Sequence, residues 1–81
     1  ALRDISVALI RVGDITAAQG DGQAAFSALQ RSLDIRETLA NADPSNAQAL
    51  RDLSISLIKV GDVKAAQGDT QGALSAFQRS L

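Results

Sequence analysis

The 81-residue sequence contains no Cys, His, Met, Trp or Tyr, and two Phe are its only aromatic residues. Without Cys and His there is no thiolate nucleophile, no disulfide, no imidazole for acid–base catalysis and none of the usual zinc ligands. The serines have no His to activate them, and no second acidic group stands at calcium-loop spacing from Asp21 or Asp69. We therefore expect a chain that is not an enzyme and that carries no cofactor or metal.

Charge of one sign and long apolar runs are lacking as well. Lys and Arg number 8 against 9 Asp and Glu, a formal net charge of −1, so a basic footprint for nucleic acid is not expected. No apolar run approaches the roughly 20 residues that a membrane-spanning helix needs, and the N-terminus shows no signal-peptide pattern. The length allows one small domain at most. We expect a cytoplasmic chain without nucleic-acid or membrane partners.

What the sequence does contain is an internal repeat. At an offset of 48 residues, 23 of the 33 pairs that align 1–33 with 49–81 are identical, and a fixed period in this range indicates a repeat array. We expect a first unit over 1–48 and a second, truncated unit over 49–81, together forming a window on a longer array.

Two of the differences between the units fall on one helical face. Phe26 and Leu29 of the first unit become Leu74 and Phe77 in the second, which exchanges the order of a larger and a smaller apolar side chain. Such an exchange keeps the volume of the pair, so it predicts that both positions belong to a packed core.

Apolar residues recur at helical spacing within each unit, as Leu53, Leu57 and Val60 do in the second. Nothing alternates with a period of two for long enough to suggest a strand. Gly13 and Gly61 interrupt the helical pattern. Either they break the helix, at about 1 kcal/mol relative to Ala, or they let a neighbouring helix approach closely, which their occurrence in both units favours.

Turn signals divide the chain into four helices. In Gln19-Gly20-Asp21, and again in Gln67-Gly68-Asp69, Gly can end one helix in the left-handed conformation and Asp can cap the next. Asp43-Pro44-Ser45-Asn46 ends the second helix and starts the third. The expected fold class is all-α, with antiparallel helical hairpins and helices over about 1–19, 22–42, 46–67 and 70–81.

These residues resemble the tetratricopeptide repeat (TPR) family, which has a Gly in its first helix, Gly-Asp at the turn, and small and aromatic residues at set spacings in its second helix. The matching positions are Gly61, Gly68-Asp69, Ala73 and Phe77 in the second unit, and Gly13, Gly20-Asp21, Ala25, Leu29 and Pro44 in the first. The resemblance covers essentially the whole chain. It implies hairpins stacked as a right-handed α-solenoid.

The sequence departs from that family in three ways. Its unit has 48 residues instead of 34, so each helix is expected to be about seven residues longer, close to two turns. The aromatic residues of the first helix are missing, with Leu9 and Leu57 at one such position. Ser32 and Ser80 replace a usual Ala.

The resemblance implies a protein-interaction scaffold whose first helices line a concave face that binds a peptide or protein segment. Carried over position by position, that face would show Val7, Ile10, Asp14, Ala17, Ile55, Ile58, Lys59, Asp62 and Ala65. Ile10 and Ile58 could equally belong to the core between units. Asp14 and Asp62 would repel a carboxylate, so we expect no carboxylate clamp of the kind that some family members use, and an apolar or mildly basic ligand instead.

Two other functional interpretations remain open. The chain could be a structural spacer or a self-associating rod without a peptide ligand, or a regulatory arm of a larger signalling protein. In the leading interpretation we expect the chain to be a segment of a larger intracellular, bacterial signalling or scaffold protein. Because a repeat does not bury its stacking face alone, we also expect copies to stack end to end or to swap segments. The residues expected to be partly exposed at the two ends are Leu2, Ile5, Leu9, Leu74, Phe77 and Leu81.

Arg36 falls on the apolar face of the second helix. Its side chain could reach water along its aliphatic stem. Alternatively it could form an ion pair between hairpins with Asp52, since both residues stand eight positions from Pro44.

Overall fold

The computed structural model describes all 81 residues, most of which lie in four helices, α1 (Leu2–Ala18), α2 (Gly22–Ala42), α3 (Ala47–Ala66) and α4 (Thr70–Ser80). The prediction of an all-α chain with four helices is confirmed, and each helix ends within one residue of its expected position. None of the four combines the length and the apolar character that crossing a lipid bilayer requires.

One type of turn joins α1 to α2 and α3 to α4. Gly20 and Gly68 have φ angles of 81° and 84°, in the left-handed region that ends a helix with glycine. The N–H of Asp21 donates to the carbonyl of Thr16 at 2.9 Å, and its carboxylate accepts from the first turn of α2 at 3.1 Å. Asp69 makes the same contacts between α3 and α4. Each Asp therefore closes one helix and caps the next, as the sequence predicts.

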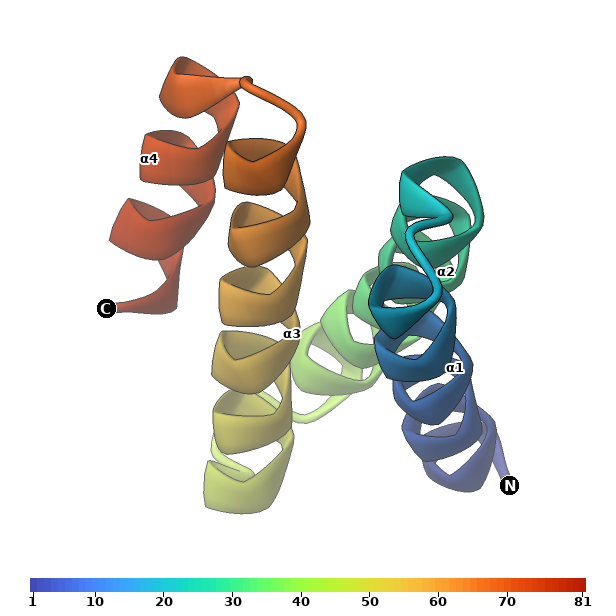
Figure 1. Cartoon of the computed structure of the whole chain (residues 1–81). Helices are drawn as coiled ribbons and strands as arrows, with labels where there is room; N and C mark the ends of the chain where they lie inside the picture. The colour runs from blue at the N-terminus through green and yellow to red at the C-terminus, as the bar shows by residue number, and fades with distance from the viewer.

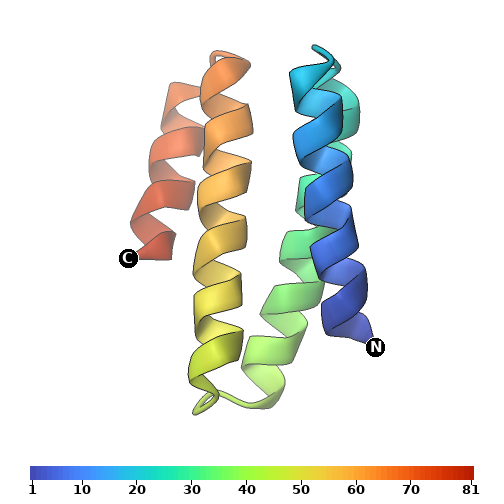
Figure 2. The same ribbon diagram turned by 60° about the horizontal axis from the view of Figure 1, so that its bottom comes forward.

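The four helices form two hairpins that pack side by side. α2 packs against both α1 and α3, and α4 packs against α3. Figure 1 shows the two helices of each hairpin running in opposite directions, and Figure 2 shows α1 and α3 side by side in front of α2 and α4. The result is a slab with extents of 35 × 26 × 13 Å. Asn46 starts α3 after the Pro44 turn by accepting a hydrogen bond from the N–H of Ala49 at 3.1 Å.

The hydrophobic core lies between the hairpins. Its six buried residues come from α2 and α3 and are Ala25, Leu29, Leu33, Leu57, Val60 and Val63. This core cluster therefore holds one repeat unit against the other.

Gly13 and Gly61 do not break their helices, because α1 and α3 continue through them. They are instead sites of close packing. A Cβ on Gly13 would lie 2.5 Å from Cγ of Leu29, and a Cβ on Gly61 would lie 2.5 Å from Cε1 of Phe77. Each glycine thus makes room inside its own hairpin for a large side chain of the second helix.

The exchange of Phe26 and Leu29 for Leu74 and Phe77 does not conserve core volume, contrary to expectation. Phe26 packs beside the core, but Leu74 is 54% exposed. Leu9 also differs from its expected exposure, because it lies on the side of α1 that faces α2 and is buried. The rest of the set expected at the ends is exposed or half-buried.

Candidate binding groove

The nine residues expected on a concave face all lie on α1 and α3, and they differ in exposure. Exposed are Asp14, Ala17, Ile55, Ile58, Asp62 and Ala65, and half-buried are Val7, Ile10 and Lys59. Ile10 packs against the core cluster, in line with the alternative interpretation of that residue. Ile58 is 42% exposed.

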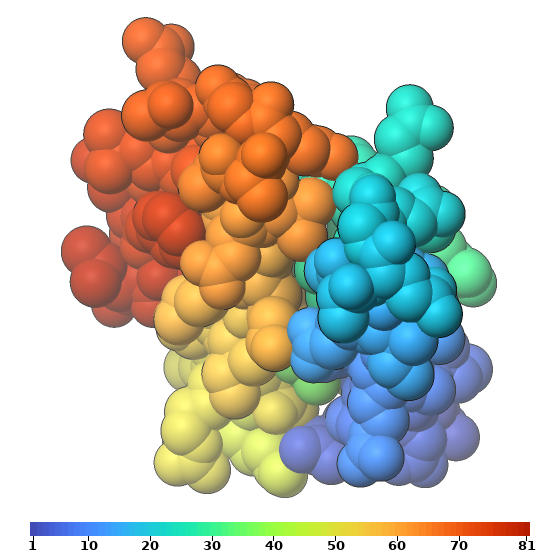
Figure 3. Space-filling view, viewed as in Figure 1, coloured from blue at the N-terminus to red at the C-terminus, as the bar shows by residue number.

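A groove lies between α1 and α3, with α2 at its base. It consists of two adjoining hollows of about 220 and 180 Å³, which have Ala17, Val63 and Ala66 in common. The space-filling view shows the hollow between the upper halves of the two helices (Figure 3). This interhelical groove is lined by Asp14 and Ala17 of α1, by Lys59, Asp62, Val63 and Ala66 of α3, by Gly22, Ala25 and Leu29 of α2, and by Gly20 and Gln67 of the turns.

The structure brings four of the nine predicted residues together in the groove, namely Asp14, Ala17, Lys59 and Asp62. The other five lie outside its lining. Val63 and Ala66 of α3, and Ala25 and Leu29 of α2, are among the residues that line it without having been predicted. The sequence prediction assigned equivalent helical positions of the two units to one concave face. A groove between two parallel helices, however, is lined by opposite flanks of each, so the lining positions on α3 are shifted around the helix relative to those on α1.

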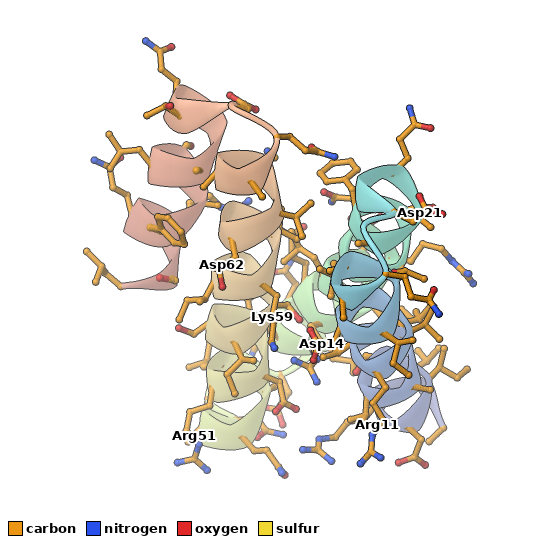
Figure 4. The ribbon with its side chains drawn as sticks, in the orientation of Figure 1. Arg11, Asp14, Asp21, Arg51, Lys59 and Asp62 are labelled. Carbon is orange, nitrogen blue, oxygen red and sulfur yellow. The ribbon has the colours of Figure 1, made fainter.

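An ion pair crosses the groove. Nζ of Lys59 donates to both carboxylate oxygens of Asp14 at 3.1 Å, and the two side chains face one another between α1 and α3 in Figure 4. They are 35% and 50% exposed, so the pair contributes at most about 1 kcal/mol to stability. Asp62 forms no such pair, which leaves the groove with two carboxylates against one ammonium group.

A buried polar cluster joins α1, α2 and α3 at the other end of the hairpins. The Nε of Arg36 donates to Oγ of Ser6 at 3.1 Å, and its Nη1 donates to Oγ of Ser56 at 3.0 Å and to the carbonyl of Asp52 at 2.9 Å. The hydroxyl of Ser32 donates to the carbonyl of Ser6 at 2.9 Å. This hydrogen bond gives a physical reason for Ser at a position where the resembled family has Ala.

Both expectations for Arg36 are wrong. The residue is only 5% exposed, so its side chain does not reach water. It does lie level with Asp52, but it binds the main-chain carbonyl, while the Asp52 carboxylate accepts from Nε of Arg3 at 2.8 Å.

The surroundings shift the two guanidinium groups in opposite directions. Burial lowers the pKa of Arg36, although the Asp52 carboxylate raises it again in part. The hydrogen bond to Asp52 and the charge of that carboxylate raise the pKa of Arg3. The largest hollow of the molecule, about 310 Å³, borders these side chains. We assign it no ligand, because the Asp52 carboxylate on its wall is already held by Arg3.

Acidic side chains do not gather into a group of three or more that could hold a metal ion. The chain shows no significant similarity to any protein-family model, curated protein or solved structure. The groove and the repeat are therefore the features of the molecule that bear on its function.

Proposed function

We propose that this chain is part of a non-catalytic, TPR-like scaffold, whose hairpins stack as units of a right-handed α-solenoid and whose interhelical groove binds a segment of a partner protein. The observation that carries the proposal is that the groove takes its two walls from successive repeat units. Each further unit would then add another groove of the same kind, so that the grooves together form a continuous binding face.

The chemistry of the groove favours a ligand with small apolar side chains and a positive charge. Ala17, Ala66 and Val63 leave room for apolar side chains along the walls. The unpaired carboxylate of Asp62 lies at the rim, where it would attract Lys or Arg and repel Asp, Glu or a C-terminal carboxylate.

Binding of matched peptides tests this proposal. We would measure fluorescence anisotropy with a labelled peptide of alternating Ala, Leu and Lys, and with the same peptide carrying Glu in place of Lys. The Lys peptide should bind at least tenfold more tightly, and added salt should reduce that preference because the charges at the rim are exposed.

The groove itself is tested by Ala17→Trp, which places an indole between the walls. We expect at least a tenfold loss of affinity for the Lys peptide. The matched control is Ala65→Trp, at the equivalent position of the second unit, where the residue is exposed but does not line the groove. Equal losses in the two variants, or tighter binding of the Glu peptide, would refute the proposal.

A structural role, as a self-associating rod, is the second candidate. It is supported by the large apolar side chains that α1 and α4 leave exposed, among them Val12, Ile15 and Leu74 at 50%, 59% and 54%.

A further inference from the structure

The outer face of α1 carries the same apolar residues as the face of α3 that α2 covers. Val60 is 1% exposed and Val63 is 8% exposed in the core, whereas their equivalents Val12 and Ile15 are 50% and 59% exposed. The residue types match, so the difference has one cause. α2 packs on α3, and no helix packs on the outer face of α1.

The outer face of α4 carries the complementary set. In α2, Leu29 and Leu33 pack against α3 as part of the core. Their equivalents are Phe77 of α4, which is half-buried, and Leu81, which follows the end of α4. One end of the chain thus presents the surface that receives a second helix of the repeat, and the other end presents a helix of that type.

The charged residues show the same relation, since a pair formed between the units has unpaired equivalents on α1 and α3. Within the chain, Lys59 of the second unit pairs with Asp14 of the first. Their equivalents are Arg11 on α1 and Asp62 on α3. Both are exposed and neither forms an ion pair. Figure 4 shows Asp62 and Arg11 apart from the pair that joins the two units.

A second ion pair joins the two units within the chain, between Nε of Arg3 and Oδ2 of Asp52 at 2.8 Å. The equivalent residues are Arg51, which has no partner, and Asp4, whose only ionic contact is with the terminal amino group at 3.7 Å. Two copies placed head to tail would therefore bring Asp62 to Arg11 and Arg51 to Asp4, each in the relation that the chain already uses internally.

We propose that a second copy of this chain docks with its α1 against α3 and α4 of the first, reproducing the contact of α3 with α2. The contact joins two different faces, so it leaves a free face at each end and continues as an open stack. The apolar match alone would fit many helices. The two charge pairs require a partner with the charge positions of this repeat, which a second copy of the chain carries. The proposal does not depend on peptide binding in the groove.

The experiment is a charge exchange read by sedimentation velocity from micromolar to millimolar concentration. We expect the weight-average sedimentation coefficient of the unmodified chain to rise with concentration. Asp62→Arg and Arg11→Asp each turn an attraction into a repulsion at every contact, and each alone should weaken association about tenfold. An equimolar mixture should recover it, since every contact between the two variants again places one positive charge opposite one negative charge, whichever variant contributes α3.

If a variant failed to associate because it was misfolded, mixing it with the other variant would not restore association. Recovery in the mixture therefore shows that both variants are folded. Val12→Glu tests the apolar face and should reduce association at least tenfold. Its control Ser27→Glu adds the same charge at a position exposed in both units and should leave association unchanged.

A chain that stays monomeric at millimolar concentration, or a mixture no better than either variant alone, would overturn the proposal. So would association that Val12→Glu leaves intact. Ala17→Trp should associate like the unmodified chain, so failure of self-association and failure of groove binding are separate results.

Discussion

Replacing Gly13 by Ala tests the close packing of α1 on α2. In an isolated helix the change is worth about 1 kcal/mol in favour of Ala. Here the new Cβ would lie 2.5 Å from Cγ and 2.6 Å from Cδ2 of Leu29, a core residue that is 2% exposed. Overpacking of this kind costs about 1–3 kcal/mol. The strain should exceed the helical gain by about 1 kcal/mol, which lowers Tm by about 4–8 °C for a domain of this size.

Leu29→Ala removes the atoms that the new methyl group would strike. In that background Gly13→Ala should raise stability by about 1 kcal/mol, since only the gain in helix propensity remains. The double-mutant cycle should then give a coupling of about 2 kcal/mol between the two positions. Urea unfolding followed by far-ultraviolet circular dichroism measures all four variants. Trimethylamine N-oxide can be added throughout, because Leu29→Ala alone costs about 2–5 kcal/mol. If Gly13→Ala stabilises both backgrounds equally, the close approach of α1 to Leu29 is refuted.

Two further predictions concern the polar cluster and the turns. Arg36→Ala should lower the free energy of unfolding by about 1–3 kcal/mol, since it leaves Ser6, Ser56 and the Asp52 carbonyl without their shared donor. Arg31→Ala, at an exposed position of the same helix, is the control, and equal losses in urea unfolding would contradict a role for the cluster. Asp21→Ala should cost about 1 kcal/mol by removing the cap of α2, and Asp21→Asn should keep most of it, so an equal fall in Tm for both variants would exclude capping.

Local rules were enough to predict the helices and their turns. The Gly-Asp pairs and Asn46 act within a few residues of themselves, so their effect could be worked out without knowing what packs nearby. The close packing at Gly13 and Gly61 could also be predicted, because a glycine in the same place of two helical units needs a reason beyond chance.

The partners of side chains between units could not be predicted in the same way. The sequence offers Asp52 only as an alternative partner for Arg36, and the choice of its carbonyl over its carboxylate depends on Arg3, which comes from a third helix. The groove lining depends on the rotation of α3 relative to α1, which no spacing along the chain specifies. Leu74 differs from Phe26 in exposure only because α2 has a neighbour on both sides.

The location of the core between the hairpins affects how the chain unfolds. The buried core cluster lies at the boundary of α2 and α3, and within the hairpins α1 packs on α2 and α4 packs on α3, so contacts inside and between the units both stabilise the fold. The stability of such a chain is approximately the sum of the intrinsic stability of each unit and a coupling between nearest neighbours. In such a chain α2 and α3, which each pack against two helices, open last, and the short α4, which packs against α3, frays first. Every added unit would raise the cooperativity of the whole.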